Sequence, residues 1–351
     1  MYQIEDYDYD LPEELIAQVP ASERDKSRLL FLERSRESLS DHFFFELPRL
    51  LKAGDTLVVN DTRVVPARIF GRKQSGGRVE VLVLEHSVDS APQGNTRWCL
   101  LRSSKRPSKG SKLFFDNQVQ GVVRSMGEDG LVQIRFEGPQ PVDLLLEEKG
   151  TMPLPPYIRR MKEDERAPVD RERYQTLFAK RAGAVACPTA GLHFTARLTD
   201  DLLQSGVTLV PLTLHVGHGT FKPVRVQDIR NHPLGKEAYT LGQETADAIN
   251  AAKREGRRVI AVGTTVVRTL ETLGGSDGTL SPTQGTTELL ITPGFEFKVI
   301  DGMITNFHLP RSSLLFLVSA FGGVGLTRKA YEWAVEKAYR FYSYGDAMLI
   351  V

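Results

Sequence analysis

Apolar and polar residues alternate along much of residues 62–137, and this pattern predicts β-strands. RVEVLVLEH (78–86) alternates, and VQGVVRSM (119–126) and LVQIRFEG (131–138) are separated by a Gly-containing turn. The segment lacks an amphipathic pattern of helical length. Short strands joined by Gly- and Ser-rich turns are typical of a small antiparallel barrel or sandwich. The segment ends at MPLPPYI (152–158), whose three prolines exclude a continuous helix and indicate a linker.

The pattern changes after residue 175, where short apolar runs alternate with amphipathic stretches. TARLTDDLLQSG (195–206) predicts a helix that Thr195 caps and Gly206 ends. By the same signals, strands are expected at 183–188, 207–216, 257–263, 288–294 and 297–307, and helices at 244–256, 264–274, 314–321 and 327–341. Strands that alternate with helices are typical of parallel βαβ units. This part of the chain therefore predicts an α/β domain.

Four loops that follow these strands contain residues that are unusual for connecting segments. The loops are CPTAGLHFT (187–195), LHVGHGTF (214–221), VGTTVVR (262–268) and TNFHLP (305–310), and they contain four of the seven histidines of the chain. Loops after parallel strands converge at one edge of the sheet, where ligands of α/β proteins bind. The four loops are therefore expected to line a single pocket.

The histidines in these loops are candidate groups for proton transfer, because imidazole titrates near neutral pH. They are His193, His215, His218 and His308, although His308 can equally serve to bond a backbone carbonyl. A zinc site would pair His215 with His218, but neither cysteine nor a Glu-x-x-His pattern accompanies them, and we expect no metal. GxSxG and a cysteine in a catalytic context are also absent from the sequence, which argues against a nucleophilic mechanism.

The glycines and threonines of the loops predict a binding site for an anionic or closely packed ligand. Gly217 and Gly219 allow a close approach of the backbone to a ligand. Thr264 and Thr265 begin a helix and offer N–H groups and hydroxyls to an anion, and Arg268, one turn later, can bind a carboxylate or phosphate with two hydrogen bonds. Walker and GxGxxG motifs do not occur in the sequence, which disfavours the common nucleotide-binding loops.

Composition and charge add two points to this picture. The 351 residues, with 41% apolar and 25% charged side chains, suffice for one to three soluble domains. The net charge of +1 does not indicate a nucleic-acid protein, yet basic residues cluster at 63–78, 100–115 and 171–181. Each cluster can be a solvated surface, but together they suggest a polyanionic partner.

Targeting and redox signals are consistent with a soluble cytoplasmic protein. The N-terminal MYQIEDYDYD is acidic and polar rather than the charged-then-apolar sequence of a secretory signal. The longest apolar run, LLFLVSAF (314–321), is too short to cross a bilayer. Two cysteines, Cys99 and Cys187, do not make a disulfide framework. We therefore expect no membrane association and a cytoplasmic location.

Six long motifs resemble those of the S-adenosylmethionine:tRNA ribosyltransferase-isomerase family of queuosine biosynthesis. They are VVNDTRVVPARIFG, CPTAGLHFT, LHVGHGTFKPV, AVGTTVVRTLE, TNFHLPRSSLLFLVSAFGG and RFYSYGDAMLI, in this order from residue 58 to 350. The chain departs from the family pattern at His218, where a small residue is usual, and at Gly322-Gly323, where Ala-Gly is more common. The resemblance implies a large, barrel-like α/β domain (1–61 and 154–351) with an inserted small antiparallel β-barrel domain (62–153).

The resemblance also implies the reaction. The family moves the ribosyl group of S-adenosylmethionine to 7-aminomethyl-7-deazaguanine at the wobble position of tRNA, and releases adenine and methionine. S-adenosylmethionine is then a consumed substrate, so we expect no cofactor, tRNA as the partner, and a monomer. Because a sulfonium acidifies the neighbouring C5′ hydrogens, a positioned base can start the rearrangement. His193 or His215 is expected to be this base, and Asp61, which can equally cap a turn, is expected to orient the attacking amine or a ribose hydroxyl.

The remaining expected site residues fall into two groups. Those expected to bind substrate are Thr189, Gly217, Gly219, Thr220, Thr264, Thr265, Arg268, Asn306 and His308. Those expected to bind tRNA are Arg63, Arg68, Arg102, Lys105 and Arg106. Two alternatives stay open at this point: an S-adenosylmethionine-dependent RNA methyltransferase, which releases S-adenosylhomocysteine, and a non-catalytic RNA-binding protein, whose function survives replacement of the histidines.

Overall fold

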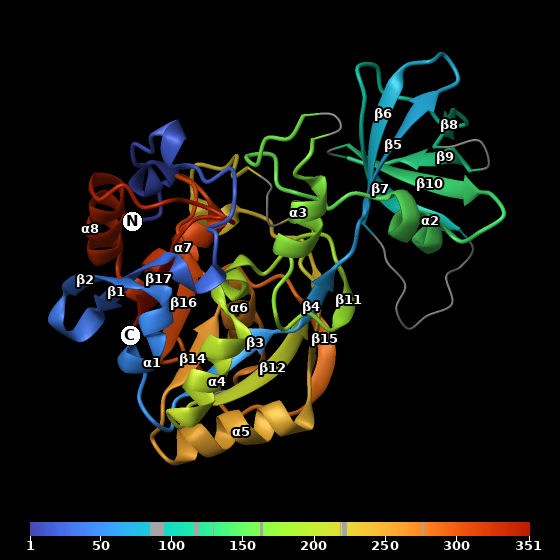
Figure 1. The fold of residues 1–351 in the computed structure, drawn as a ribbon. Helices are drawn as coiled ribbons and strands as arrows, with labels where there is room; N and C mark the ends of the chain where they lie inside the picture. Colours follow the sequence, from blue (N-terminus) through green and yellow to red (C-terminus); the bar gives the residue numbers. More distant parts are fainter. Residues whose placement is uncertain are drawn as a thin grey trace.

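The computed structural model describes residues 1–84, 95–115, 119–128, 130–161, 164–217, 219, 223–275 and 277–351. Thr220 and His218, which the sequence singled out, lie outside the described residues. The chain forms a large α/β part and a small β-barrel beside it (Figure 1). This is the expected fold class: a mixed α/β protein with a closed antiparallel barrel inserted into the chain.

The small barrel is built from six strands whose alternating burial matches the sequence pattern. The strands are β5 (Arg68–Lys73), β6 (Arg78–Val83), β7 (Thr96–Arg102), β8 (Lys112–Phe114), β9 (Gln120–Met126) and β10 (Leu131–Glu137). They close in the order β10-β7-β6-β5-β8-β9, and every neighbouring pair is antiparallel. Helix α2 (Val142–Lys149) contributes Val142, Leu145 and Leu146 to the barrel core. Because alternate residues of each strand are buried in the barrel interior, apolar and polar residues alternate in the sequence of this segment.

The large part contains a nine-stranded mixed sheet. Its strands are β1 (Arg28–Glu33), β2 (Ser38–Phe43), β3 (Thr56–Asn60), β12 (Thr208–Leu214), β13 (Glu237–Leu241), β14 (Val259–Val262), β15 (Thr283–Thr287), β16 (Gly302–Asn306) and β17 (Ala347–Ile350). The order is β15-β13-β12-β3-β14-β16-β17-β1-β2, and the run β12-β3-β14-β16 is parallel. The carboxyl ends of these four strands therefore lie at one edge.

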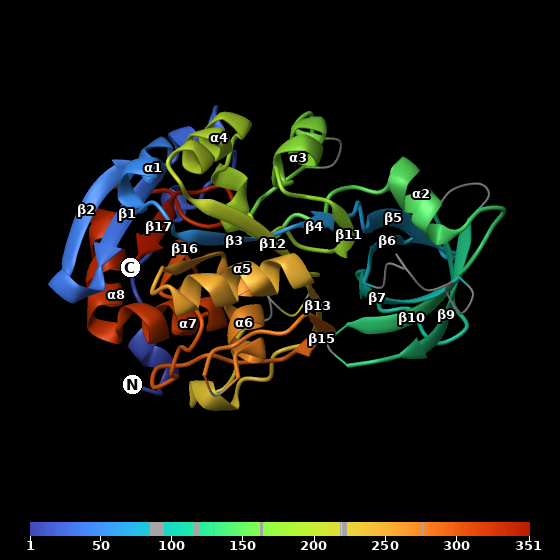
Figure 2. The same ribbon diagram turned by 90° about the horizontal axis from the view of Figure 1, so that it is seen from below.

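Helices cover both faces of this sheet, as the view in Figure 2 shows. They are α1 (Leu47–Leu50), α4 (Ala196–Gln204), α5 (Gln243–Arg254), α6 (Thr264–Leu273), α7 (Ser313–Gly322) and α8 (Val324–Glu336), and α3 (Ala167–Arg173) lies toward the barrel. Leu57 and Val59 of β3 pack in a core with residues of α1 and α4, whereas Val58 packs in the opposite core with residues of α5 to α8. The two-residue period of the strand thus supplies both cores, as expected for strands buried on both faces.

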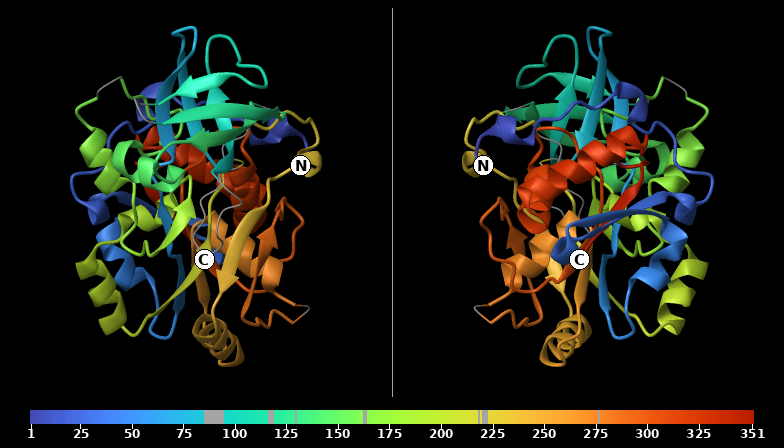
Figure 3. Two further views of the ribbon diagram at one scale, coloured as in Figure 1. Left: turned by 90° about the vertical axis from the view of Figure 1, so that its right-hand side faces the viewer. Right: turned by 90° about the vertical axis from the view of Figure 1, so that its left-hand side faces the viewer.

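The barrel is joined to the large part by two short stretches of chain. β4 (Thr62–Val64) lies within the range expected for the insert, yet it pairs with β11 (Arg181–Ala184) of the large part. At the other end, Arg68 of β5 forms an isolated bridge with Thr151. Figure 3 shows the two ends of the molecule, with the barrel strands in front in the left panel and α8, β1 and β2 in front in the right panel.

Several predicted element boundaries are corrected by the structure. Residues 288–294 form no strand, and the strand of this region, β15, lies before them. Of the predicted strand 297–307, only residues 302–306 pair with neighbouring strands, as β16. The backbone N–H groups of residues 298–300 instead bond the carboxylate of Glu271. The last helix, predicted to reach residue 341, ends at Glu336, and Ala338 has a positive φ of 51°. Helices 314–321 and 195–206 are confirmed, with Ser312 and Thr195 as their caps.

Glu271 on α6 is predicted to stabilise the large part strongly. Its carboxylate is 8% exposed and accepts the N–H groups of Lys298 at 2.9 Å and of Val299 and Ile300 at 3.1 Å each. Glu271→Ala leaves three donors without their acceptor, so the free energy of unfolding should fall by at least about 3 kcal/mol. The control Glu244→Ala, at an exposed position of α5, should change it by less than about 0.5 kcal/mol. Equal urea midpoints for the two variants would contradict this role.

Candidate active site

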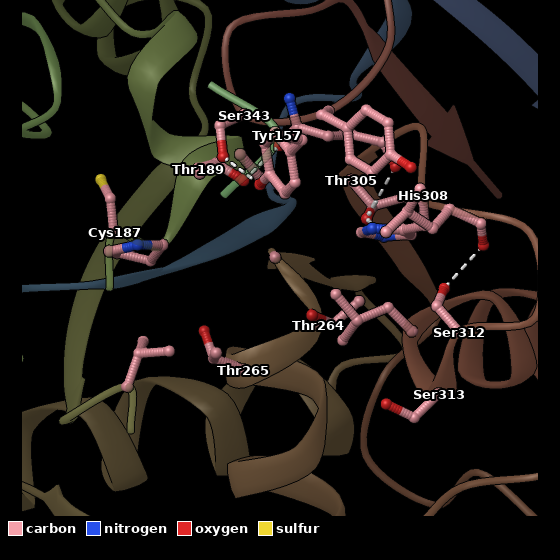
Figure 4. A pocket seen from close by; sticks show the side chains of 18 of the residues that line it. Tyr157, Cys187, Thr189, Thr264, Thr265, Thr305, His308, Ser312, Ser313 and Ser343 are labelled. Carbon is pink, nitrogen blue, oxygen red and sulfur yellow. Dashed lines mark hydrogen bonds between the residues drawn. The ribbon is translucent and has the colours of Figure 1, made fainter. Parts of the chain in front are cut away.

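A cavity of about 290 Å³ lies at the carboxyl edge of the parallel strands (Figure 4). It is enclosed by the start of α6, the segment after β16, the segment 187–190 and the linker residues Pro156 and Tyr157. Of the residues expected to bind substrate, the cavity is lined by Thr189, Thr264, Thr265, Asn306 and His308. The loops after β14 and β16 therefore do converge, as the sequence predicted.

The N-terminus of α6 forms one wall of the cavity. Gly263 precedes the helix with a φ of +94°, a conformation that other residues rarely adopt. Thr264 and Thr265 follow at the first helical turn, and Asn60 at the end of β3 donates to the hydroxyl of Thr265 at 3.3 Å. The first N–H groups of a helix lack partners within the helix and attract negative charge. This wall is suited to a carboxylate or another electron-rich group.

Asn306 connects the cavity to His193 through a chain of hydrogen bonds. Its Oδ1 accepts from Thr189 at 2.8 Å, and its Nδ2 donates to Nε2 of His193 at 3.0 Å. An amide nitrogen only donates, so Nε2 of His193 carries no proton and Nδ1 donates to the hydroxyl of Ser27 at 2.7 Å. Both ring nitrogens of His193 are thus engaged, and the residue is not among those that line the cavity.

His193 is held in its neutral form by its surroundings. The residue is 4% exposed and its ring stacks on Phe44, with centroids 4.9 Å apart. Burial, followed by the nearby charges of Arg24 and Arg340, lowers the pKa of His193 to about 3. A neutral ring with a fixed tautomer orients Asn306 and Thr189 at the cavity wall.

His308 lines the cavity itself. Its Nε2 lies 2.8 Å from the hydroxyl of Thr305, which in turn donates to the carbonyl of Asn306 at 3.3 Å. Its backbone N–H donates to the hydroxyl of Tyr331 at 3.0 Å, and Tyr9 donates to its carbonyl. Burial lowers the pKa of His308 to about 3, so its imidazole is neutral. Figure 4 shows the ring and its bond to Thr305 at the cavity wall.

His215 and Asp61 lie beside the cavity rather than on its wall. Nδ1 of His215 lies 2.8 Å from the hydroxyl of Thr62, and the ring packs so tightly on Gly183 that an added Cβ would approach it to 2.8 Å. The buried carboxylate of Asp61 accepts from Thr213 at 2.5 Å. Both residues thus join the end of the parallel sheet to the β4–β11 pair.

Arg268, Gly217 and Gly219 border a second, smaller cavity of about 110 Å³. The guanidinium of Arg268 is 6% exposed, forms an ion pair with Glu237 and donates to the carbonyl of Leu289 at 2.9 Å. The other carboxylate oxygen of Glu237 accepts the N–H of Gly217 at 2.9 Å. The second cavity shares Ser313 and Leu314 with the first, so the two adjoin.

The sequence reasoning missed an aromatic wall of the cavity. Tyr157 of the linker and Tyr342 stack with centroids 4.3 Å apart and an interplanar angle of 26°, and the hydroxyl of Tyr157 lies 2.7 Å from that of Ser343. Tyr342 has a φ of +70°, a strained conformation for a residue with a side chain. Tyr342 and Ser343 lie in RFYSYGDAMLI, one of the motifs that carry the family resemblance. Cys187 also lines the cavity, but burial raises the pKa of its thiol, which therefore stays protonated.

The expected tRNA-binding residues lie on and near the barrel. Arg102, Lys105 and Arg106 are exposed, although Arg106 also donates to the carbonyls of Gly127 and Leu131. Arg63 lies 3.8 Å from Glu147. Arg68 is half-buried, pairs with Glu80 at 3.2 Å and donates to the carbonyl of Leu154 at 2.7 Å, so it fixes the junction between barrel and linker.

Two structural features do not occur in the described ranges, a metal-binding cluster and a membrane-spanning helix. Over these residues, groups of three or more His, Cys, Asp or Glu side chains arranged to hold a metal ion do not occur. Of the helices that the structure describes, none has both the length and the apolar character of a membrane span.

The two neutral histidines predict a loss of stability in mild acid. In the folded protein the pKa of His193 and of His308 is about 3, against 6.5 in the unfolded chain, so only the unfolded chain takes up these protons as the pH falls. Stability is therefore complete above pH 6.5 and is lost below it, by up to about 1.4 kcal/mol per pH unit for each histidine. Urea unfolding at about pH 7 and about pH 5.5 measures this, and His193→Gln should reduce the dependence. An unchanged wild-type free energy across this interval would contradict the burial of neutral imidazoles.

Comparison with known proteins gives a consistent result along the whole chain. The family model described as "Queuosine biosynthesis protein" matches residues 4–350. The S-adenosylmethionine:tRNA ribosyltransferase-isomerases of Geobacter sulfurreducens and Syntrophotalea carbinolica are each 48% identical to this chain. Each alignment covers 99% of this chain, and it covers 99% of the Geobacter protein and 100% of the Syntrophotalea protein. The crystal structure of S-adenosylmethionine tRNA ribosyltransferase from Thermotoga maritima matches this one with a TM-score of 0.55 and 36% sequence identity. The match covers 99% of this chain and 100% of the Thermotoga chain. The chain therefore belongs to the queuosine biosynthesis family, the family of the S-adenosylmethionine:tRNA ribosyltransferase-isomerases.

Proposed function

We propose that this enzyme transfers the ribosyl group of S-adenosylmethionine to 7-aminomethyl-7-deazaguanine at the wobble position of a tRNA, and that the reaction occurs in the 290 Å³ cavity. The observation that carries this proposal is the 48% identity, over 99% of the chain, to proteins named S-adenosylmethionine:tRNA ribosyltransferase-isomerase. The products are epoxyqueuosine in the tRNA, adenine and methionine. We propose that S-adenosylmethionine is consumed as a substrate without a further cofactor, and that the enzyme acts as a cytoplasmic monomer.

The cavity wall offers a complement to each part of S-adenosylmethionine. The stacked rings of Tyr157 and Tyr342 present an aromatic surface for adenine. The N-terminus of α6, with the hydroxyls of Thr264 and Thr265, favours the carboxylate of the methionine part. Asn306, oriented by His193, adds a polar group to the cavity lining.

We propose that His308 is the base that starts the reaction. The hydroxyl of Thr305 donates its proton to the carbonyl of Asn306, so Nε2 of His308 donates to Thr305 and Nδ1 keeps its lone pair. In the step, the C5′–H bond breaks, its electron pair stays on the carbon beside the sulfonium, and the proton passes to Nδ1. His193, which was expected to be the base, then acts as a positioning residue through Asn306.

Small-molecule products test the proposed reaction. With labelled S-adenosylmethionine and tRNA that contains 7-aminomethyl-7-deazaguanine, the enzyme should release adenine and methionine in equal amounts, because the sulfonium leaves as a thioether and the glycosidic bond breaks. Liquid chromatography with mass spectrometry quantifies both. Formation of S-adenosylhomocysteine with a methylated tRNA would overturn the proposal in favour of a methyltransferase.

The role of His308 is tested by hydrogen exchange at C5′. In heavy water with unmodified tRNA, the wild type should replace a C5′ hydrogen of S-adenosylmethionine by deuterium, since proton removal is reversible when no acceptor amine is present. His308→Gln should slow this exchange about 10²- to 10⁴-fold, with the dissociation constant for S-adenosylmethionine little changed. The control His42→Gln, on β2 away from the cavity, should exchange like the wild type. Wild-type exchange in His308→Gln would show that another group is the base.

A further inference from the structure

We propose that the outer face of the small barrel around Phe70 and Phe114 is a stacking surface for unpaired bases of the tRNA anticodon loop. This inference rests on the proposed function, because it names the surface that holds the tRNA substrate. Phe70 and Phe114 lie on the barrel that also carries the basic stretches 63–78 and 100–115.

Phe70 and Phe114 are large apolar side chains on the solvent side of the barrel. They are 56% and 40% exposed, whereas their sequence neighbours Ile69 and Leu113 are 3% and 0% exposed and fill the barrel core. Alternate side chains of each strand point into the barrel and out of it, and the two aromatic rings belong to the side chains that point out. Neither ring contributes to the barrel core, so both remain available for a partner.

Strand register brings the two rings together around a cation. Arg72 of β5 lies directly opposite Phe114 of β8, and Phe70 lies two residues before Arg72 on the same face. On the other side of β5, Arg72 lies opposite Arg78 of β6. Within the described ranges, Arg72 and Arg78 form no ion pair or side-chain hydrogen bond, so both charges face the solvent next to the rings. The one carboxylate opposite Phe70, that of Glu80, is paired with Arg68 at 3.2 Å.

This combination fits single-stranded RNA better than a protein surface. Aromatic rings stack on the faces of any base, and arginines between them neutralise the phosphates. Glu80 is the acidic residue closest in register, and its charge is compensated by Arg68, so the surface as a whole attracts a polyanion.

The position of the surface connects it to the cavity. Arg68 lies on the same outer face, two residues before Phe70, and its guanidinium donates to the carbonyl of Leu154 at 2.7 Å. Two residues after Leu154, the linker lines the cavity with Pro156 and then Tyr157. Each residue of a strand advances the chain by about 3.3 Å, so Phe70 lies about 7 Å from this junction along β5. An RNA loop that stacks on Phe70 thus lies near the junction from which the linker leads to the cavity.

The test is the affinity for tRNA of barrel variants. Phe70→Ala and Phe114→Ala should each weaken binding about 5- to 100-fold, because each removes one stacked base. Phe70→Tyr keeps an aromatic face and should restore most of the affinity. Arg72→Ala should reduce the slope of log affinity against log salt by about 0.7 to 0.9. The matched control Leu144→Ala removes an exposed apolar side chain of α2, which is 53% exposed in the same small part, and should bind like the wild type.

The outcomes separate this inference from the proposed function. The variants should bind S-adenosylmethionine like the wild type, because the cavity lies in the large part. If the double variant Phe70→Ala/Phe114→Ala binds tRNA with the affinity and salt dependence of the wild type, the inference is overturned. The proposed function is not affected by that result, because it is tested by adenine release from the wild type. If that double variant instead changes the oligomeric state in light scattering without loss of tRNA affinity, the face is a contact between copies of the chain and the inference is also overturned. Failure of the wild-type enzyme to release adenine would overturn the proposed function itself.

Discussion

The parallel pairing of β12, β3, β14 and β16 is the constraint on which the site depends. Parallel strands require long crossovers, so every strand end at one edge is followed by a loop or helix start rather than by a tight hairpin. Side chains from segments that are far apart in the sequence meet there: Asn60 at the end of β3, Thr264 and Thr265 after β14, and Asn306 at the end of β16. The hydrogen bond between Asn60 and Thr265 spans two neighbouring strands and shows how closely the ends converge.

Neutral polar groups, rather than charges, organise the cavity. Burial keeps the imidazoles of His193 and His308 neutral before the reaction. In the proposed step His308 becomes charged only as an electron pair is left on C5′ beside it. Neutral rings with defined tautomers still direct hydrogen bonds, as His193 does toward Asn306 and His308 toward Thr305. Arg311, the charged residue among those that line the cavity, forms an ion pair with Asp8, which reduces its repulsion of a substrate that carries a positive sulfonium.

The two parts of the molecule differ in which faces of their strands are buried. The large part buries its central strands β3, β14, β16 and β17 on both faces, and the cavity lies at strand ends. The barrel buries one face of each strand and leaves the other at the surface, where we propose that the tRNA binds. Arg68 lies where these two surfaces meet, and its contacts with Glu80 and Leu154 explain why it is half-buried although it stands within a basic stretch.

The sequence by itself determined most of the barrel strands, several helices and strands of the α/β part after residue 183, and the loops that line the cavity, because two-residue and helical periodicities are local and the loop motifs are contiguous. It placed Thr189, Thr264, Thr265, Asn306 and His308 in one pocket correctly. Only the tertiary structure decided which histidine faces the cavity: His193 and His308 both follow strands, but Asn306 lies between His193 and the cavity wall. It also paired Arg268 with Glu237, 31 residues earlier, and stacked Tyr157 on Tyr342 across 185 positions of the chain. Such contacts depend on strand order and packing, which local sequence patterns do not encode.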